Sequence, residues 1–79
     1  MLFINRKAVL DTLVKHETMT MDDISKEENM GFVPNLQQLK FILLQLTIHG
    51  HILVLSGALP LTYTITSKGI EESNRLMRP

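Results

Sequence analysis

Two histidines and two pairs of carboxylates are the side chains of this sequence with the clearest capacity for chemistry. His49 and His51 flank Gly50, and imidazole is a common metal ligand, but the sequence identifies no third ligand to set beside them. Nothing ties the acidic pairs at positions 22–23 and 27–28 to a pocket or raises a carboxylate pKa. We therefore expect no metal site, and interpret these residues as polar helix ends and a solvated acidic surface.

Motifs of enzymes are the next possibility. Ser56–Gly57 lacks the context of a nucleophile elbow, and the sequence contains no glycine-rich phosphate loop. A domain of 79 residues with a filled core has little room for a substrate cavity. We expect neither catalysis nor a cofactor.

A third group of side chains could read DNA. Asn35, Gln37, Gln38 and Lys40 lie at the start of a predicted helix, where amides can pair with adenine and lysine can meet guanine or phosphate. Lys68, at the start of the last predicted helix, could add a phosphate contact. The alternative is that Asn35 caps the helix and that the other side chains are ordinary solvated residues.

The charge pattern weighs against DNA. Lys40 is the only charged residue between Asn29 and Ser67, and the whole chain has a formal net charge of zero. Proteins that bind DNA take most of their nonspecific affinity from several Lys and Arg contacts to phosphate. The region expected to touch DNA is therefore unusually poor in positive charge.

The same predicted helix is apolar on two faces. One face is expected to face the core and carries Leu36, Leu39, Ile42, Leu43 and Leu46. Phe41, Leu44 and Ile48 form a second stripe on nearly the opposite side, and such a stripe must also be buried. Three coverings stay open: other parts of this chain, a second protein such as a twin subunit or a partner, and DNA with Phe41 against a sugar or a thymine methyl.

The elements that would position these side chains follow from periodicity and from capping residues. Asn5, Thr20 and Asn35 each precede a helical pattern, which predicts helices over about residues 5–16, 21–29 and 36–49. Gly50 ends the third helix. Strand-forming residues then predict a hairpin over about 52–65, and Thr66 or Ser67 caps a last helix over about 67–77. The chain is expected to be one α+β domain.

Two segments of the chain resemble a known family. Leu43–Ile52 is similar to the end of the recognition helix in MarR-like and PadR-like winged-helix regulators, where a leucine precedes a glycine and an aliphatic residue opens the wing. Tyr63–Gly69 resembles the signature that closes the wing and starts the next helix. The resemblance covers about residues 5–77 and implies a winged helix-turn-helix domain.

In function, the resemblance implies a small transcriptional regulator that binds duplex DNA as a homodimer. The last helix, with Ile70, Leu76 and Met77, would then be the dimer element. The alternative is a winged helix that serves as a protein–protein interaction module without DNA binding, and its contact would be the stripe of Phe41, Leu44 and Ile48.

The expected location is cytoplasmic. Residues 1–7 lack the order of charged, apolar and small residues that export requires, and the chain has no cysteine. The most apolar run, Leu36–Ile52, is interrupted by polar residues and falls short of the roughly 20 residues that cross a bilayer. We expect no contact with a membrane.

Overall fold

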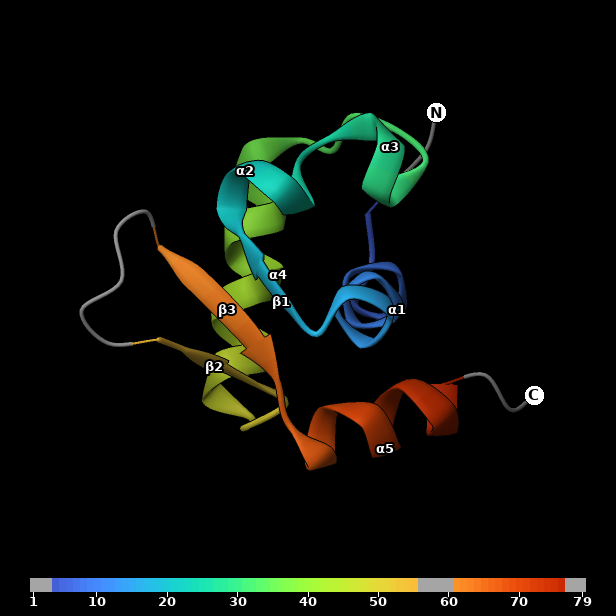
Figure 1. Ribbon diagram of the computed structural model, residues 1–79, viewed down its shortest axis with the longest axis vertical. Helices are drawn as coiled ribbons and strands as arrows, with labels where there is room; N and C mark the ends of the chain where they lie inside the picture. Colours follow the sequence, from blue (N-terminus) through green and yellow to red (C-terminus); the bar gives the residue numbers. More distant parts are fainter. Residues whose placement is uncertain (1–3, 56–60, 77–79) are drawn as a thin grey trace.

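The computed structural model describes residues 4–55 and 61–76 (Figure 1). This part of the chain forms five helices and a three-stranded antiparallel sheet, so the predicted α+β class is confirmed. In chain order the elements are α1 (Arg6–His16), β1 (Thr18–Thr20), α2 (Met21–Ile24), α3 (Glu27–Met30), α4 (Leu36–Ile48), β2 (Ile52–Val54), β3 (Thr62–Ile65) and α5 (Ser67–Leu76).

The sheet has β3 at its centre, in the order β1-β3-β2. Tyr63 of β3 is paired with Met19 of β1 on one side and with Val54 of β2 on the other. The predicted hairpin is therefore confirmed, and its turn, residues 56–60, lies outside the described residues. Strand β1 was not predicted, because three residues of the type Thr-Met-Thr indicate a strand only when their distant pairing partner is known.

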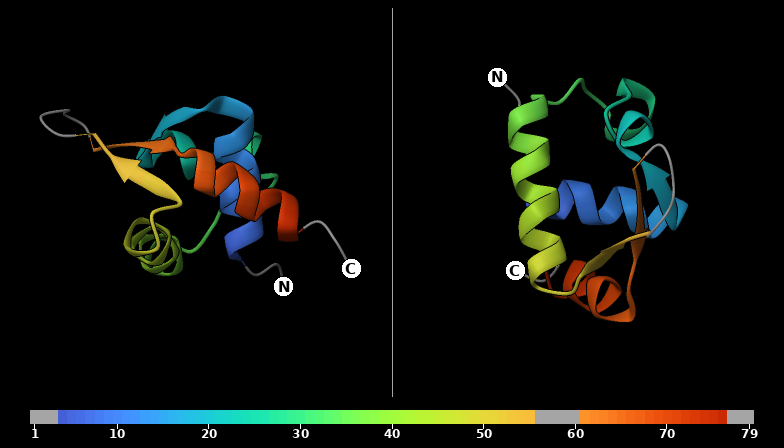
Figure 2. Two further views of the ribbon diagram at one scale, coloured as in Figure 1. Left: turned by 90° about the horizontal axis from the view of Figure 1, so that it is seen from below. Right: turned by 90° about the vertical axis from the view of Figure 1, so that its left-hand side faces the viewer.

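The core lies between α1, α4 and the sheet. Its fully buried side chains are Val9, Leu10, Leu13, Ile24, Leu39, Leu43, Leu46 and Ile52. Helix α1 contacts α3, α4, α5 and β3, whereas α4 lies along one edge of the molecule (Figure 2). One face of α4 is thus packed on α1 and β2, and the other is turned away from them.

The structure confirms the predicted caps at Asn5 and Thr20 and the predicted stop at Gly50. The side-chain oxygen of Asn5 accepts a hydrogen bond from the amide of Ala8 at 2.8 Å. Thr20 forms a capping box with Asp23, in which each side chain bonds the backbone of the other residue. Gly50 follows α4 with a φ of 76°, a left-handed conformation that suits glycine and stops the helix.

The single helix predicted over residues 21–29 is wrong, because the segment is broken after Ile24. Lys26 has an extended backbone, with φ −76° and ψ 137°, and begins α3 as its N-cap residue. The side-chain amide of Asn29 donates to the carbonyl of Asp23 at 2.6 Å, and the Ser25 hydroxyl donates to the carbonyl of Asp22 at 2.9 Å. The side chains of Asn29 and Ser25 thus bond carbonyls at the break, where the Asp23 carbonyl also accepts the amide of Lys26 at 3.3 Å.

Helix α5 begins at the predicted cap, Thr66. Its hydroxyl oxygen accepts a hydrogen bond from the amide of Gly69 at 3.0 Å. The same oxygen lies 2.8 Å from the carbonyl oxygen of Gly50 and 2.9 Å from that of His51, to either of which the hydroxyl can donate. The start of α5 is therefore held against the segment that leaves α4.

Candidate functional site

The outer face of α4 carries three exposed large hydrophobic side chains. Phe41, Leu44 and Ile48 are 60%, 55% and 66% exposed, and together we call them the apolar stripe. Their spacing of three and four residues aligns them along one side of the helix. In the right-hand view of Figure 2, α4 forms one edge of the molecule, with α1 and the hairpin on its other side.

The described residues bear on one of the three coverings that the sequence left open for the apolar stripe. No described part of the chain packs over the stripe, so the first covering, by other parts of this chain, is not found within residues 4–55 and 61–76. Helix α1 and strand β2 pack on the core face of α4, on which Leu39, Leu43 and Leu46 have almost no accessible surface. The other two coverings, a second protein and DNA, stay predictions.

Leu36 also departs from the prediction. It was expected on the core face, but 53% of it is exposed. In Figure 2 the first turn of α4 extends beyond α1, the helix that packs on the core face further along. Ile42 is only partly buried, although it does pack against the core.

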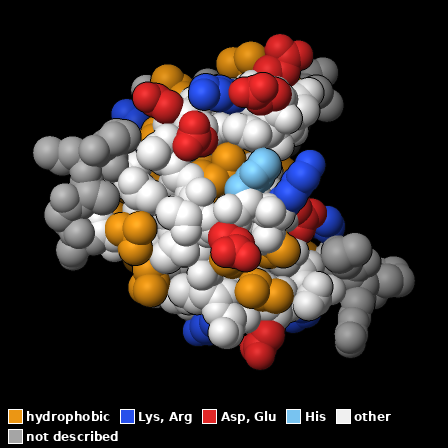
Figure 3. Space-filling model, viewed as in Figure 1, with side chains coloured by type: hydrophobic (Ala, Val, Ile, Leu, Met, Phe, Trp, Pro, Cys, Tyr) orange, Lys and Arg blue, Asp and Glu red, His pale blue; other side chains and the backbone are white. Residues whose placement is uncertain are grey.

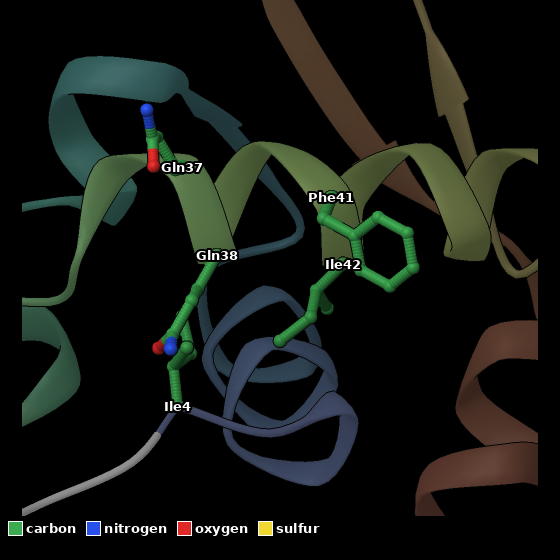
Figure 4. A pocket seen from close by; sticks show the side chains of 5 residues that line it. All are labelled: Ile4, Gln37, Gln38, Phe41 and Ile42. Atoms are coloured by element: carbon green, nitrogen blue, oxygen red, sulfur yellow. The ribbon is translucent and has the colours of Figure 1, made fainter.

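An open hollow of about 370 Å³ borders the apolar stripe, lined by Ile4, Gln37, Gln38, Phe41 and Ile42. Figure 4 shows Gln38 and Ile42 pointing from α4 toward Ile4, whereas Gln37 points to the opposite side of the helix. The prediction from sequence missed Ile4. The available signal was a hydrophobic residue directly before the N-cap Asn5, the position that packs against the first turn of a helix in a hydrophobic staple.

The predicted DNA-reading residues do not form one cluster. Gln37, Gln38 and Lys40 are exposed on the first turns of α4. Asn35 is engaged in capping, since its side-chain oxygen accepts the amide hydrogen of Gln38 at 3.1 Å. Lys68 lies beside Gly50 at the far end of α4, about 20 Å along the helix from Asn35 at 1.5 Å per residue.

Acidic side chains occupy the elements that precede α4. Asp22 and Asp23 lie in α2, and Glu27 and Glu28 lie in the first turn of α3, with Lys26 between the two pairs. Figure 3 shows acidic side chains over this end of the molecule. Hydrogen bonds from the backbone and side chain of Thr20 lower the pKa of Asp23, so its carboxylate stays charged. A negative surface here repels phosphate.

The predicted dimer residues of α5 have different surroundings. Leu76 packs against the core, and Ile70 is 41% exposed. The helix lies against α1, where the Ser73 hydroxyl donates to the Asp11 carboxylate at 2.6 Å. Met77 lies outside the described residues. One face of α5 is thus already used within the chain, and the interface role of its residues stays a prediction.

The two histidines are stacked but differ in burial. Their ring centroids are 5.9 Å apart, His49 is exposed, and His51 is buried with no hydrogen-bond partner for its Nδ1 among the described residues. Burial lowers the pKa of His51, and the nearby Glu72 only partly opposes this effect. The described residues contain no group of three His, Cys, Asp or Glu side chains that could hold a metal ion.

Comparison with other proteins gives no family for this chain. No protein-family model matches it, and no curated protein is similar to it in sequence. No helix in the described ranges is long and apolar enough to cross a membrane.

Proposed function

We propose that this chain is a protein–protein interaction module of the winged-helix type, and that the outer face of α4 binds an apolar surface of another polypeptide. The observation that carries the proposal is the exposure of the apolar stripe: Phe41, Leu44 and Ile48 are each more than half exposed on one helix face. Three large hydrophobic side chains aligned on a free surface mark an interaction site in a folded protein.

The order of elements supports the winged-helix part of the proposal. Short helices α2 and α3 precede α4, and α4 is followed directly by the β2–β3 hairpin. In the winged-helix arrangement that the sequence resembles, α4 takes the place of the recognition helix and the hairpin that of the wing. The face of α4 that would meet DNA is then the face that carries the apolar stripe.

The charges of that face favour protein over DNA as the ligand. Lys40 is its one charged residue, and the acidic side chains of α2 and α3 lie on the preceding elements. Each Lys or Arg contact to phosphate adds to DNA affinity by releasing counterions, so a face with one such residue gains little. An apolar partner instead gains from covering the stripe.

DNA binding is the second candidate function, and a specific observation favours it. Gln37, Gln38 and Lys40 are exposed together at the N-terminal turns of α4, the part of a recognition helix that approaches base edges. Amide and ammonium groups at these positions can pair with adenine and guanine.

A photo-cross-linker distinguishes the two candidates. We would place a benzophenone side chain at position 44 and, in a matched control, at position 53, because Leu44 and Leu53 are 55% and 54% exposed on different elements. After irradiation in the cells that naturally make the protein, we expect a cross-linked polypeptide from position 44 and not from position 53. The absence of a polypeptide product at position 44 would overturn the proposal, and a DNA product there would favour the second candidate.

A further inference from the structure

We propose that the partner of the α4 face is a second copy of this chain, bound through its own α4 in an antiparallel pair. This inference rests on the proposed function and adds the identity of the partner. It places the dimer contact on α4 rather than on α5, which is packed against α1.

The spacing of the apolar stripe suits two-fold symmetry. A symmetric dimer needs a face on which residue i contacts residue j of the second copy while j contacts i. With the axis between positions 44 and 45, Phe41 of each antiparallel helix lies opposite Ile48 of the other, and the two Leu44 side chains meet near the axis. The largest side chain of the stripe thus faces an aliphatic one in both halves of the contact.

The charges allow this pairing. The chain has a formal net charge of zero, so two copies approach without long-range repulsion. In the antiparallel pair, Lys40 lies opposite His49 of the second copy, and the two Lys40 residues are nine positions apart along the helix direction. At 1.5 Å per residue this separation is about 13 Å, longer than the Debye length of about 8 Å at physiological salt. A strongly charged partner, by contrast, would find no complementary charges on the stripe.

The size of the surface sets the expected strength of the contact. At about 200 Å² for a large apolar side chain, the exposed parts of Phe41, Leu44 and Ile48 offer about 360 Å² in each copy. Together with the polar side chains that flank the stripe, two copies would bury about 1,000 Å², near the lower limit of specific interfaces. We therefore expect a reversible dimer that forms at about 100 µM and dissociates at about 1 µM.

Sedimentation analysis with charge variants tests the proposal. The unchanged protein should sediment as a dimer at about 100 µM. Leu44→Glu and Leu44→Lys should each be monomeric there, because like charges meet at the axis, and an equal mixture of the two should dimerise again. Leu53→Glu, at an equally exposed leucine on β2, should dimerise like the unchanged protein. Circular dichroism of each variant verifies folding.

A single cysteine gives a second measurement that does not depend on added charge. The chain has no cysteine of its own, so one introduced thiol reports on one position. Helices packed 8–10 Å apart, with Cα atoms about 2.3 Å from each axis, bring facing Cα atoms to about 3.5–5.5 Å, a range that overlaps the Cα separation of a disulfide. Oxidised Leu44→Cys should form a covalent dimer, and Leu53→Cys should stay a monomer.

Several results would overturn the inference: a monomer at 100 µM, a dimer that Leu44→Glu leaves intact, or no disulfide at position 44. The proposed function fails separately. If the protein is monomeric but position 44 cross-links to a different polypeptide in cells, the α4 face is an interaction site and only its partner was misidentified. If it is monomeric and position 44 cross-links to no polypeptide, both proposals fail.

Discussion

A Cβ atom on Gly69 would lie 2.0 Å from the backbone carbonyl oxygen of His51. The same carbonyl accepts a hydrogen bond from the amide of Thr66 at 3.2 Å, and the Thr66 hydroxyl oxygen lies 2.9 Å from it. The first turn of α5 therefore rests directly on the backbone that leaves α4. The hydrogen of a glycine fits in this contact, and a methyl group does not, which gives a physical reason for the glycine of the Tyr63–Gly69 segment.

Gly69→Ala should lower the free energy of unfolding by about 2 kcal/mol. Forcing a methyl group into a packed site costs about 1–3 kcal/mol, here at the upper end because the obstructing atom belongs to the backbone. The better helix propensity of alanine offsets at most about 1 kcal/mol of this destabilisation. Urea denaturation followed by circular dichroism measures the change. Asn74→Ala, at an exposed position of the same helix, is the control and should stay within about 0.5 kcal/mol. Equal midpoints for the two variants would contradict the close contact.

Truncating two adjacent leucines of α4 should change the free energy of unfolding by very different amounts. Leu43 is buried, so Leu43→Ala leaves a cavity and should cost about 2–5 kcal/mol of unfolding free energy. Leu44 is exposed in the isolated chain, so Leu44→Ala should change the stability of the monomer by less than about 0.5 kcal/mol. Denaturation at about 1 µM protein, where the proposed dimer is dissociated, measures both. A large loss for Leu44→Ala would show that the stripe is part of the core.

The sequence alone predicted those features of the fold that depend on residues close together in the chain. The caps at Asn5, Thr20 and Asn35 and the stop at Gly50 were predictable because each acts through hydrogen bonds or backbone angles within a few residues. The burial of the core face of α4 followed from helical periodicity. Which element covers the opposite face depends on tertiary packing, and periodicity contains no information about it.

The errors in the fold have the same origin. Strand β1 forms because Thr18–Thr20 pairs with β3, which lies far along the chain. The local sequence therefore contains no pattern that predicts this strand. At the break between α2 and α3, the side-chain amide of Asn29 donates to the carbonyl of Asp23, a contact that helix propensities do not include. The exposed stripe is likewise visible only once α1 and β2 are placed on the other side of α4.

Ser73→Ala should raise the pKa of Asp11. Burial alone raises that pKa, but hydrogen bonds from Lys7 and Ser73 outweigh the effect, so the carboxyl titrates below its usual value. Removing the Ser73 hydroxyl removes one of these donors and should also cost about 1 kcal/mol of stability. NMR titration of the Asp11 carboxyl carbon measures the shift. Ser67→Ala, at an exposed serine, should leave the pKa of Asp11 unchanged; an unchanged value in Ser73→Ala would mean that the hydrogen bond is absent in solution.

Stability should fall as the pH drops below about 7, because of His51. Burial holds the pKa of His51 below its ordinary value of 6.5 in the folded chain. As the pH falls through 6.5, the unfolded chain binds a proton at this residue and the folded chain does not, so unfolding becomes more favourable. Glu72 acts in a separate, more acidic range, since its hydrogen bond with Arg75 holds its pKa at about 2.

Urea denaturation at pH 7.5 and pH 5.5 measures the contribution of His51. The stability difference between the two pH values should shrink in His51→Gln. It should persist in His49→Gln, which changes the exposed member of the stacked pair. If both variants kept the full difference, the acid sensitivity would have to arise from another group.

Binding to duplex DNA should be weak and only slightly dependent on salt. The slope of log affinity against log salt concentration is about −0.9 for each neutralised phosphate, so the single lysine of the α4 face predicts a slope near −1. Fluorescence anisotropy of mixed-sequence duplex DNA at rising salt measures it. Lys40→Ala should abolish this slope and Gln37→Ala should leave it unchanged, because only Lys40 carries charge. A slope steeper than about −4 would require several phosphate contacts, which α4 cannot supply alone. In that case Lys68 and the other basic residues would have to reach the DNA together, and the second candidate function would replace the first.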